Sequence, residues 1–211
     1  MNRKHLTALA AMVIFSVAAA VAQNASVESV CRSLTSNPVT TGNFTQEKKI
    51  ANAKRTLKSS GTFLFSGKLV IWDTAKPVAS SLIVTGDKII QKSPNGKTTV
   101  LSGKDNDAFK GVSQSVTALF SGDKSALEKN FTIKFSSTAN SWQMVLTPKD
   151  KTVASAMKTI TVSGTGNSKA STFTGLVVEQ LDGGTITYTF TDHKYREELS
   201  DAEKALLNTA K

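Results

Sequence analysis

The chain has 211 residues with a formal net charge of +10, and 39% of its residues are hydrophobic while 20% are charged. This balance argues against intrinsic disorder, and the four prolines and 13 glycines, which follow no period, exclude proline-rich and collagen-like chains. The single cysteine, Cys31, can form neither an intrachain disulfide nor a four-cysteine zinc site, and two histidines cannot build a multi-histidine site. We therefore expect one globular domain without a metal or cofactor.

The N-terminus has the pattern of a secretory signal peptide. Arg3 and Lys4 precede an apolar run from Leu6 to Val21, and small residues at Ala20 and Ala22 favour cleavage before residue 23. The alternative is a membrane anchor, but the run is shorter than the roughly 20 residues that span a bilayer. The sequence thus predicts a signal peptide at residues 1–22 and a single exported domain at residues 23–211.

After this segment, the pattern predicts a short helix over residues 25–37, followed by strands. Apolar residues alternate with polar ones from residue 39 to residue 103, and glycine, proline and asparagine mark short turns between the runs. The first block of expected strands covers 43–50, 56–66, 68–74, 80–86, 88–92 and 97–101. Such short connections favour an antiparallel meander over βαβ units.

Residues 105–120 interrupt the strands with helical spacing, because Phe109, Val112, Val116, Leu119 and Phe120 fall on one stripe. Strands then resume at 130–137, 141–147, 158–164, 171–181 and 185–191, with a helical turn near 153–157 and a capped helix from Ser200 to Thr209. These elements predict a mainly β (α+β) fold, an incomplete antiparallel barrel of about eleven strands with a helical plug.

Some of the predicted strands carry apolar residues at both odd-numbered and even-numbered positions, which is to say on both faces (the two parities). This pattern indicates what covers each face of the sheet. Leu57, Phe63 and Phe65 share one parity, whereas Leu64, Val70, Trp72 and Ile90 are predicted on the opposite one. A strand that is apolar on both faces is covered twice or faces an apolar cavity. An internal apolar space is therefore possible.

The sequence shows no catalytic constellation, so no enzyme activity is expected. His193 is a lone, exposed histidine by prediction, no Gly-x-Ser-x-Gly motif is present, and carboxylates stand mostly beside lysines. Cys31 has no histidine nearby in the sequence and is expected to be a small buried hydrophobe. The lysines are scattered and not interleaved with aromatic residues, so no nucleic acid partner is expected. A solvated basic surface and contact with lipid headgroups or an acidic partner both stay open.

Six segments carry recognisable motifs, and they follow one another along the chain: 43–48 (NFTQEK), 57–65 (LKSSGTFLF), 72–77 (WDTAKP), 119–123 (LFSGD), 142–149 (WQMVLTPK) and 183–190 (GGTITYTF). In this order they resemble the LolA family of periplasmic lipoprotein carriers. The resemblance implies an unclosed barrel of eleven strands with a helical lid, whose concave face holds the acyl chains of a lipoprotein in the periplasm. It also implies a monomer that an inner-membrane ATP-driven complex (LolCDE-like) loads and an outer-membrane receptor (LolB-like) unloads.

One stretch departs from the family pattern. The best-studied carriers of the family have an arginine shortly before the strand that contains the tryptophan of the third motif, and this arginine latches the lid. In this chain the basic residue nearest to that position is Lys68. A lysine is a point charge without the planar fork of arginine, so Lys68 is only a possible lid latch. The chain is also similar to LolA-like relatives linked to glycolipid or polyene lipid export, which gives an alternative cargo, carried or sensed.

Aromatic and aliphatic residues of the expected strands and lid are the candidates for acyl-chain binding. Each of them could equally be an ordinary core residue. The candidates are Phe44, Phe63, Phe65, Trp72, Leu82, Val84, Val116, Leu119, Phe120, Phe131, Phe135, Trp142 and Met144. A structural β-domain with a filled core is the third possibility.

Overall fold

The computed structural model describes residues 24–53, 55–67, 69–85, 88–102, 117–118 and 120–209 of the chain. Its strands are β1 (Val39–Lys49), β2 (Thr56–Ser66), β3 (Leu69–Lys76), β4 (Ser80–Thr85), β5 (Lys88–Lys92), β6 (Thr98–Ser102), β7 (Phe131–Ser137), β8 (Ser141–Pro148), β9 (Met157–Gly166), β10 (Ser171–Gln180) and β11 (Thr185–Arg196). Its helices are α1 (Val27–Thr35), α3 (Lys124–Asn130), α4 (Lys151–Ala156) and α5 (Asp201–Thr209).

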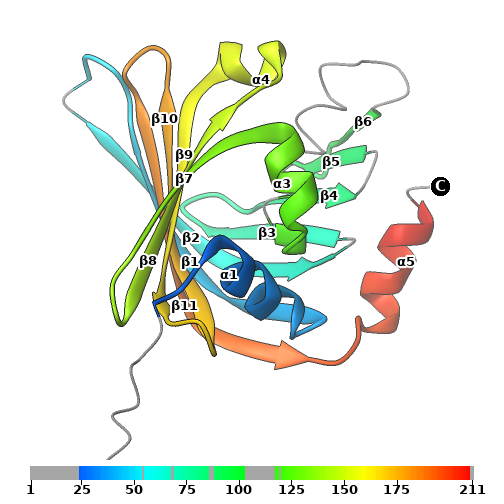
Figure 1. Cartoon of the computed structure of the whole chain (residues 1–211). Helices are drawn as coiled ribbons and strands as arrows, with labels where there is room; N and C mark the ends of the chain where they lie inside the picture. The colour runs from blue at the N-terminus through cyan, green and yellow to red at the C-terminus, as the bar shows by residue number, and fades with distance from the viewer. Residues whose placement is uncertain are drawn as a thin grey trace, which may run out of the picture.

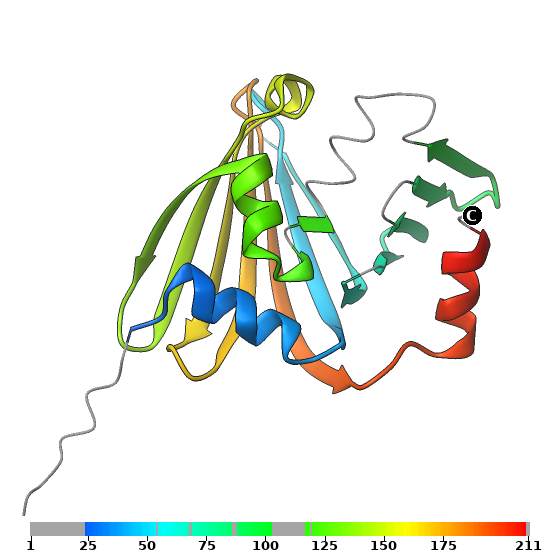
Figure 2. The same ribbon diagram turned by 45° about the vertical axis from the view of Figure 1, so that its right-hand side comes forward.

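The eleven strands of the described residues form one antiparallel sheet. The order β6-β5-β4-β3-β2-β1-β11-β10-β9-β8-β7 joins two meanders through the pairing of β1 with β11, and it leaves β6 and β7 at the two edges. The sheet curls around α1 and α3 without closing, as Figures 1 and 2 show. This confirms the predicted incomplete barrel.

The sequence analysis missed α3 and placed the start of β1 too late. Asp123 caps α3 by accepting a hydrogen bond from the N–H of Ala126, but the helix is only 7 residues long and carries too little apolar periodicity to be recognised. β1 begins at Val39 because this residue pairs with Ser66 of β2 and Arg196 of β11 at once. Most of the predicted central helix lies outside the described residues.

The apolar residues of β2 and β3 are sorted by strand register. Phe63 lies opposite Trp72 and Phe65 opposite Val70, so all four side chains point to the concave face. The prediction that Val70 and Trp72 lie on the opposite face from Phe63 was wrong, because the β2–β3 turn resets the parity that a count along the chain assumes. Leu64 does face the other way, as predicted.

A second apolar cluster lies on the convex face and is covered by α5. Its buried members are Val39, Leu64, Leu69, Ile71, Ile83 and Ile90, and Leu199, Leu206 and Leu207 pack on them. In Figure 2, α5 lies on the side of the sheet opposite α1 and α3. Both faces of β2–β5 are therefore covered, which explains the apolar residues on both parities. Within the described ranges, every helix is too short or too polar to cross a membrane.

Candidate functional site

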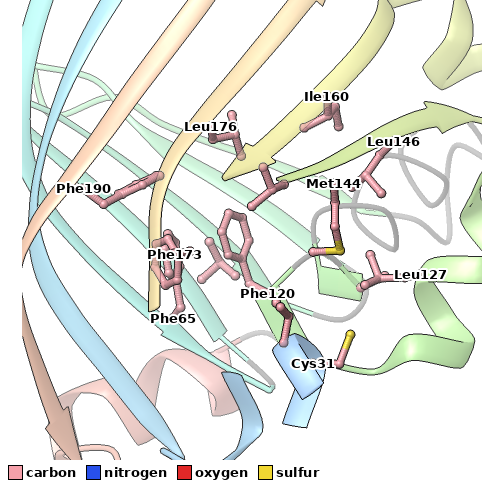
Figure 3. Close-up of a cluster of buried hydrophobic side chains, with 14 of the residues drawn as sticks. Cys31, Phe65, Phe120, Leu127, Met144, Leu146, Ile160, Phe173, Leu176 and Phe190 are labelled. Carbon is pink, nitrogen blue, oxygen red and sulfur yellow. The ribbon is translucent and has the colours of Figure 1, made fainter. Parts of the chain in front are cut away.

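The concave face gathers aromatic rings around Phe120. The ring of Phe120 stacks on Phe65 with centroids 3.9 Å apart, and it meets Trp72 edge-on at 5.4 Å. Figure 3 shows Phe120 between Phe65 and Phe173 on one side and Met144 and Leu127 on the other. Edge-to-face aromatic pairs such as that of Phe120 with Trp72 stabilise a core beyond the area they bury. Phe120 thus packs the segment before α3 against the concave face of the sheet.

Gly122 fixes the backbone that follows this ring. Its φ of +65° favours glycine, and an added Cβ would lie 2.6 Å from the carbonyl oxygen of Cys31 and 2.7 Å from Cγ2 of Thr35. The chain therefore passes directly over α1 at this point. α1 is itself anchored, because Ser137 Oγ donates a hydrogen bond to the carbonyl of Ala25 at 2.8 Å.

An apolar cavity of about 380 Å³ lies beside Phe120 in the concave face, and we call it the sheet cavity. Side chains from both meanders form its wall. Its lining consists of Gln46, Trp72, Thr74, Ser80, Ser81, Leu82, Val84, Ile89, Gln91, Phe120, Met157, Ile160, Leu176, Val178 and Tyr188. The volume falls within the 300–1,000 Å³ range that is typical of ligand pockets.

The described lining of the sheet cavity is uncharged. None of the lining side chains in the part of the chain that the structure describes carries a charge, and burial raises the pKa of Tyr188 to about 12, so that its hydroxyl keeps its proton at physiological pH. The Nε1–H of Trp72 is buried without a hydrogen-bond acceptor among the described residues. An unpaired buried donor is costly, and an oxygen of a bound molecule would satisfy it.

A second cavity of about 400 Å³, the helix cavity, lies between the end of α1, the start of β1 and residues 197–199. Phe65 and Phe120 line it together with Leu34, Phe173 and Leu199, whereas Glu197 and Glu198 make its edge acidic. Phe120 lines both cavities, and among the described residues predicted for the site it is the one common to the two.

The structure places the predicted acyl-binding residues in three environments. Trp72, Leu82, Val84 and Phe120 line the sheet cavity, and Phe65 lines the helix cavity. The residues packed into the core on the concave side are Phe44, Phe63, Phe131, Trp142 and Met144, with Phe135 half-buried against them. Val116, Leu119 and the possible latch Lys68 lie outside the described residues.

Several lining residues were missed by the sequence analysis. Met157, Ile160, Leu176, Val178 and Tyr188 all come from the second meander, β9 to β11. Their alternating apolar pattern was visible, but only the pairing of β1 with β11 brings that meander opposite Trp72 and Leu82.

Two further residues were singled out from the sequence. Cys31 is buried as predicted, and burial, aided by the charge of Asp123, raises the pKa of its thiol to about 11. His193 was predicted to be exposed, which was wrong: it is half-buried against the rings of Phe63 and Phe173, at 5.6 and 5.1 Å. Burial lowers the pKa of His193, although the Phe173 carbonyl and Asp192 oppose this. Within the described ranges, no three His, Cys, Asp or Glu residues cluster to hold a metal.

Fold and cavity together place the chain in the class of open half-barrel proteins with a hollow apolar concave face. The family model described as "Outer membrane lipoprotein carrier protein LolA" matches residues 36–203, and the chain belongs to this family. None of the curated protein sequences compared with the chain matches it.

Several solved structures are similar to this chain at low sequence identity. A DUF1329 family protein from Desulfovibrio piger is 11% identical and has a TM-score of 0.50, with 86% of this chain and 96% of that chain covered. A LolA superfamily protein from Nitrosomonas europaea is 11% identical, with a TM-score of 0.46 over 83% and 94% of the two chains. A putative outer membrane lipoprotein-sorting protein domain from Vibrio parahaemolyticus is 10% identical, with a TM-score of 0.48 over 86% and 96%.

Proposed function

We propose that this protein is a periplasmic carrier that holds the acyl chains of lipoproteins in the sheet cavity and shuttles them from the inner to the outer membrane. The observation that carries the proposal is a cavity of about 380 Å³, whose described lining is uncharged and largely apolar, in a chain of the LolA family. Each CH₂ group that leaves water for such a cavity gains about 0.8 kcal/mol. A chain of many CH₂ groups therefore binds without any charged contact.

The lining suits a ligand that must also be released. Met157 is flexible and polarisable, and aromatic faces such as that of Trp72 tolerate acyl chains in many positions. The unpaired Nε1–H of Trp72 can donate to an ester or amide oxygen near the head of the chain. Such a site discriminates little between chains, which is what a carrier of many lipoproteins needs.

The proposal also includes export of the chain to the periplasm and a partner at each membrane. Residues 1–22 would be removed as a signal peptide, and residues 23–211 would act as a monomer in the periplasm. A LolCDE-like complex of the inner membrane would load the carrier, and a LolB-like receptor of the outer membrane would accept the cargo. No chemical step on the cargo is required, so the proposed role is non-enzymatic.

The size of the cavity supports a second candidate, a carrier or sensor of another amphiphile, such as a glycolipid or a polyene lipid. A volume of about 380 Å³ lies near the lower end of the range for ligand pockets. A single-chain amphiphile therefore fits the cavity more readily than a diacylated one, which would require Phe120 to move.

Uptake of a fluorescent fatty acid by protein purified without detergent tests the binding step. We expect saturable uptake that Leu82→Asp lowers at least about tenfold, because it places a charge in the apolar lining. Leu82 is 37% exposed, so the substitution should leave the fold intact. Val100→Asp, at a 54% exposed site on β6 outside the cavity, is the matched control. Absence of saturable uptake in the unmodified protein would refute the proposal.

Deletion of the gene distinguishes the two cargoes. If lipoproteins are the cargo, fractionation of the deletion strain should find outer-membrane lipoproteins retained in the inner membrane. Normal lipoprotein sorting, together with fatty acid uptake by the purified protein, would favour the second candidate and reject the first.

A further inference from the structure

One end of the half-barrel exposes apolar side chains, and we call it the rim. The rim consists of the turn around Ile50 between β1 and β2, the turn 181–184 between β10 and β11, and α4; Figures 1 and 2 show these three elements side by side. Ile50 is 43% exposed, Leu57 45% and Leu181 59%. The described turns 138–140 and 167–170 at the opposite end hold no large exposed hydrophobic residue, although Tyr195 of β11, which pairs with Thr40 near that end, is 49% exposed.

Cations outnumber anions around these apolar residues. The described cations of the rim and its flanks are Lys48, Lys49, Arg55, Lys58, Lys149, Lys151 and Lys158, and the anions are Glu47, Asp150, Glu179 and Asp182. Among the described residues, neither Lys49 nor Arg55 has a carboxylate within ion-pair distance, and the same holds for Lys151. These cations are therefore available to an anionic surface.

The four anions are engaged within the protein. Glu47 pairs with Lys58 at 2.7 Å, and Asp150 caps α4 by accepting from the N–H groups of Thr152 and Val153. Asp182 likewise accepts from the N–H of Gly184 at 2.8 Å. Glu179 accepts a hydrogen bond from the hydroxyl of Thr159 at 3.0 Å. The four carboxylates of the rim thus form ion pairs or hydrogen bonds within the protein, whereas most of the rim's cations form no ion pair with a described carboxylate.

The sheet cavity approaches the rim along the concave face. Gln46 lines the cavity, and Lys48, one pleat further along β1, lies between Leu57 of β2 and Ile186 of β11. Gln46 and Lys48 thus form a row along β1 that runs from the cavity wall to the exposed turn at Ile50. A hydrocarbon chain that leaves the cavity in this direction meets apolar contacts flanked by a cation.

We propose that the rim docks on an anionic bilayer surface, with Ile50 and Leu181 inserted among the lipids and Lys49 and Arg55 paired with lipid phosphates. Apolar tips with a basic flank are the features that bind proteins to such interfaces, and each nearby cation adds about 1 kcal/mol. This inference goes beyond the proposed carrier role, because docking does not depend on whether the cavity takes lipid.

Flotation with vesicles tests the docking. Mixed vesicles of phosphatidylcholine and phosphatidylglycerol should bind the protein at low salt, whereas vesicles of phosphatidylcholine alone should bind much less, and added salt should weaken binding. Lys49→Gln and Arg55→Gln should each lower the partition coefficient roughly fivefold. Ile50→Ser together with Leu181→Ser should lower it at least about tenfold.

Matched controls lie outside the rim. Val100→Ser removes an apolar residue that is 54% exposed on β6, and Lys169→Gln removes a cation from the turn between β9 and β10. Neither should change vesicle binding. Because all these sites are exposed, each variant should keep the thermal unfolding temperature and the fatty acid uptake of the parent protein.

Three outcomes would overturn the inference. The first is equal binding to neutral and anionic vesicles, and the second is an equal loss of binding in the control variants. The third is no binding to vesicles; crosslinks to a membrane protein that the rim variants lose would then assign the rim to a protein partner. If fatty acid uptake fails while vesicle binding succeeds, the carrier proposal falls and the docking inference stands.

Discussion

The ring of Phe120 lies almost parallel to that of Phe65, with centroids 3.9 Å apart and planes 17° apart. The stack joins the segment before α3 to β2, and it stands where the sheet cavity and the helix cavity share a lining residue. The position of one ring therefore determines how much apolar space the concave face offers.

Phe120→Ala should enlarge that space. We expect a gain in affinity for a fluorescent diacyl lipid relative to a single-chain fatty acid, measured by titration of both probes. The free energy of unfolding should fall by about 3 kcal/mol, as for other buried Phe→Ala changes. Phe135→Ala, at a half-buried ring outside both cavities, should lower stability without changing the preference. An unchanged preference in Phe120→Ala would contradict the role given to this ring.

Gly122→Ala should lower the free energy of unfolding by more than the strain of a left-handed backbone alone would. The substitution adds a left-handed φ penalty of about 1 kcal/mol and a Cβ that lies 2.6 Å from the Cys31 carbonyl oxygen. Gly183→Ala is the control, because its φ is +87° but its Cβ would meet nothing within 4 Å. Urea denaturation should show a larger loss for Gly122→Ala. Equal losses would mean that α1 moves aside freely.

Glu203 should make α5 sensitive to acid. Burial raises the pKa of its carboxyl, but hydrogen bonds from Arg196, at 2.8 Å, and from Ser200 outweigh this and hold the pKa below 4.5. A carboxyl whose pKa is depressed by folding stabilises the protein above its unfolded pKa, and this stabilisation is lost as the pH falls through the folded value.

The unmodified protein should therefore lose more free energy of unfolding below pH 4.5 than Glu203→Gln does. Chemical denaturation at pH 7 and at successively lower pH values measures the difference. Glu28→Gln, on the exposed side of α1, is the control and should follow the unmodified protein. Parallel pH profiles for the unmodified protein and Glu203→Gln would show that this contact contributes no pH dependence.

Cys31 should resist thiol reagents in the folded protein. It is 3% exposed and its pKa is raised to about 11, so that hardly any reactive thiolate is present at pH 8. Labelling with a maleimide, followed by mass spectrometry, should be slow in buffer and rapid in denaturant. Rapid labelling in buffer would show that α1 detaches readily from the sheet.

Local pattern was enough to predict that each described strand exists, although β1 begins earlier and β11 ends later than predicted. The observed bounds of β2 and β5 are those predicted, and β10 differs by a single residue, because alternating side chains and turn-forming residues act over a few neighbours. The buried state of Cys31 and the family motifs were also visible in the sequence. α3 was missed, since Asp123 and Leu127 alone give too weak a signal for so short a helix.

Only the tertiary structure decided which face each apolar residue occupies and which of them border open space. Trp72 lies with Phe63 because of the register between β2 and β3, and Met157 reaches the same cavity because β1 pairs with β11. Phe44 and Met144 carry the same apolar character as Leu82, yet they are packed into the core while Leu82 lines the cavity. Strand order and packing depend on contacts between distant parts of the chain, which no local period encodes.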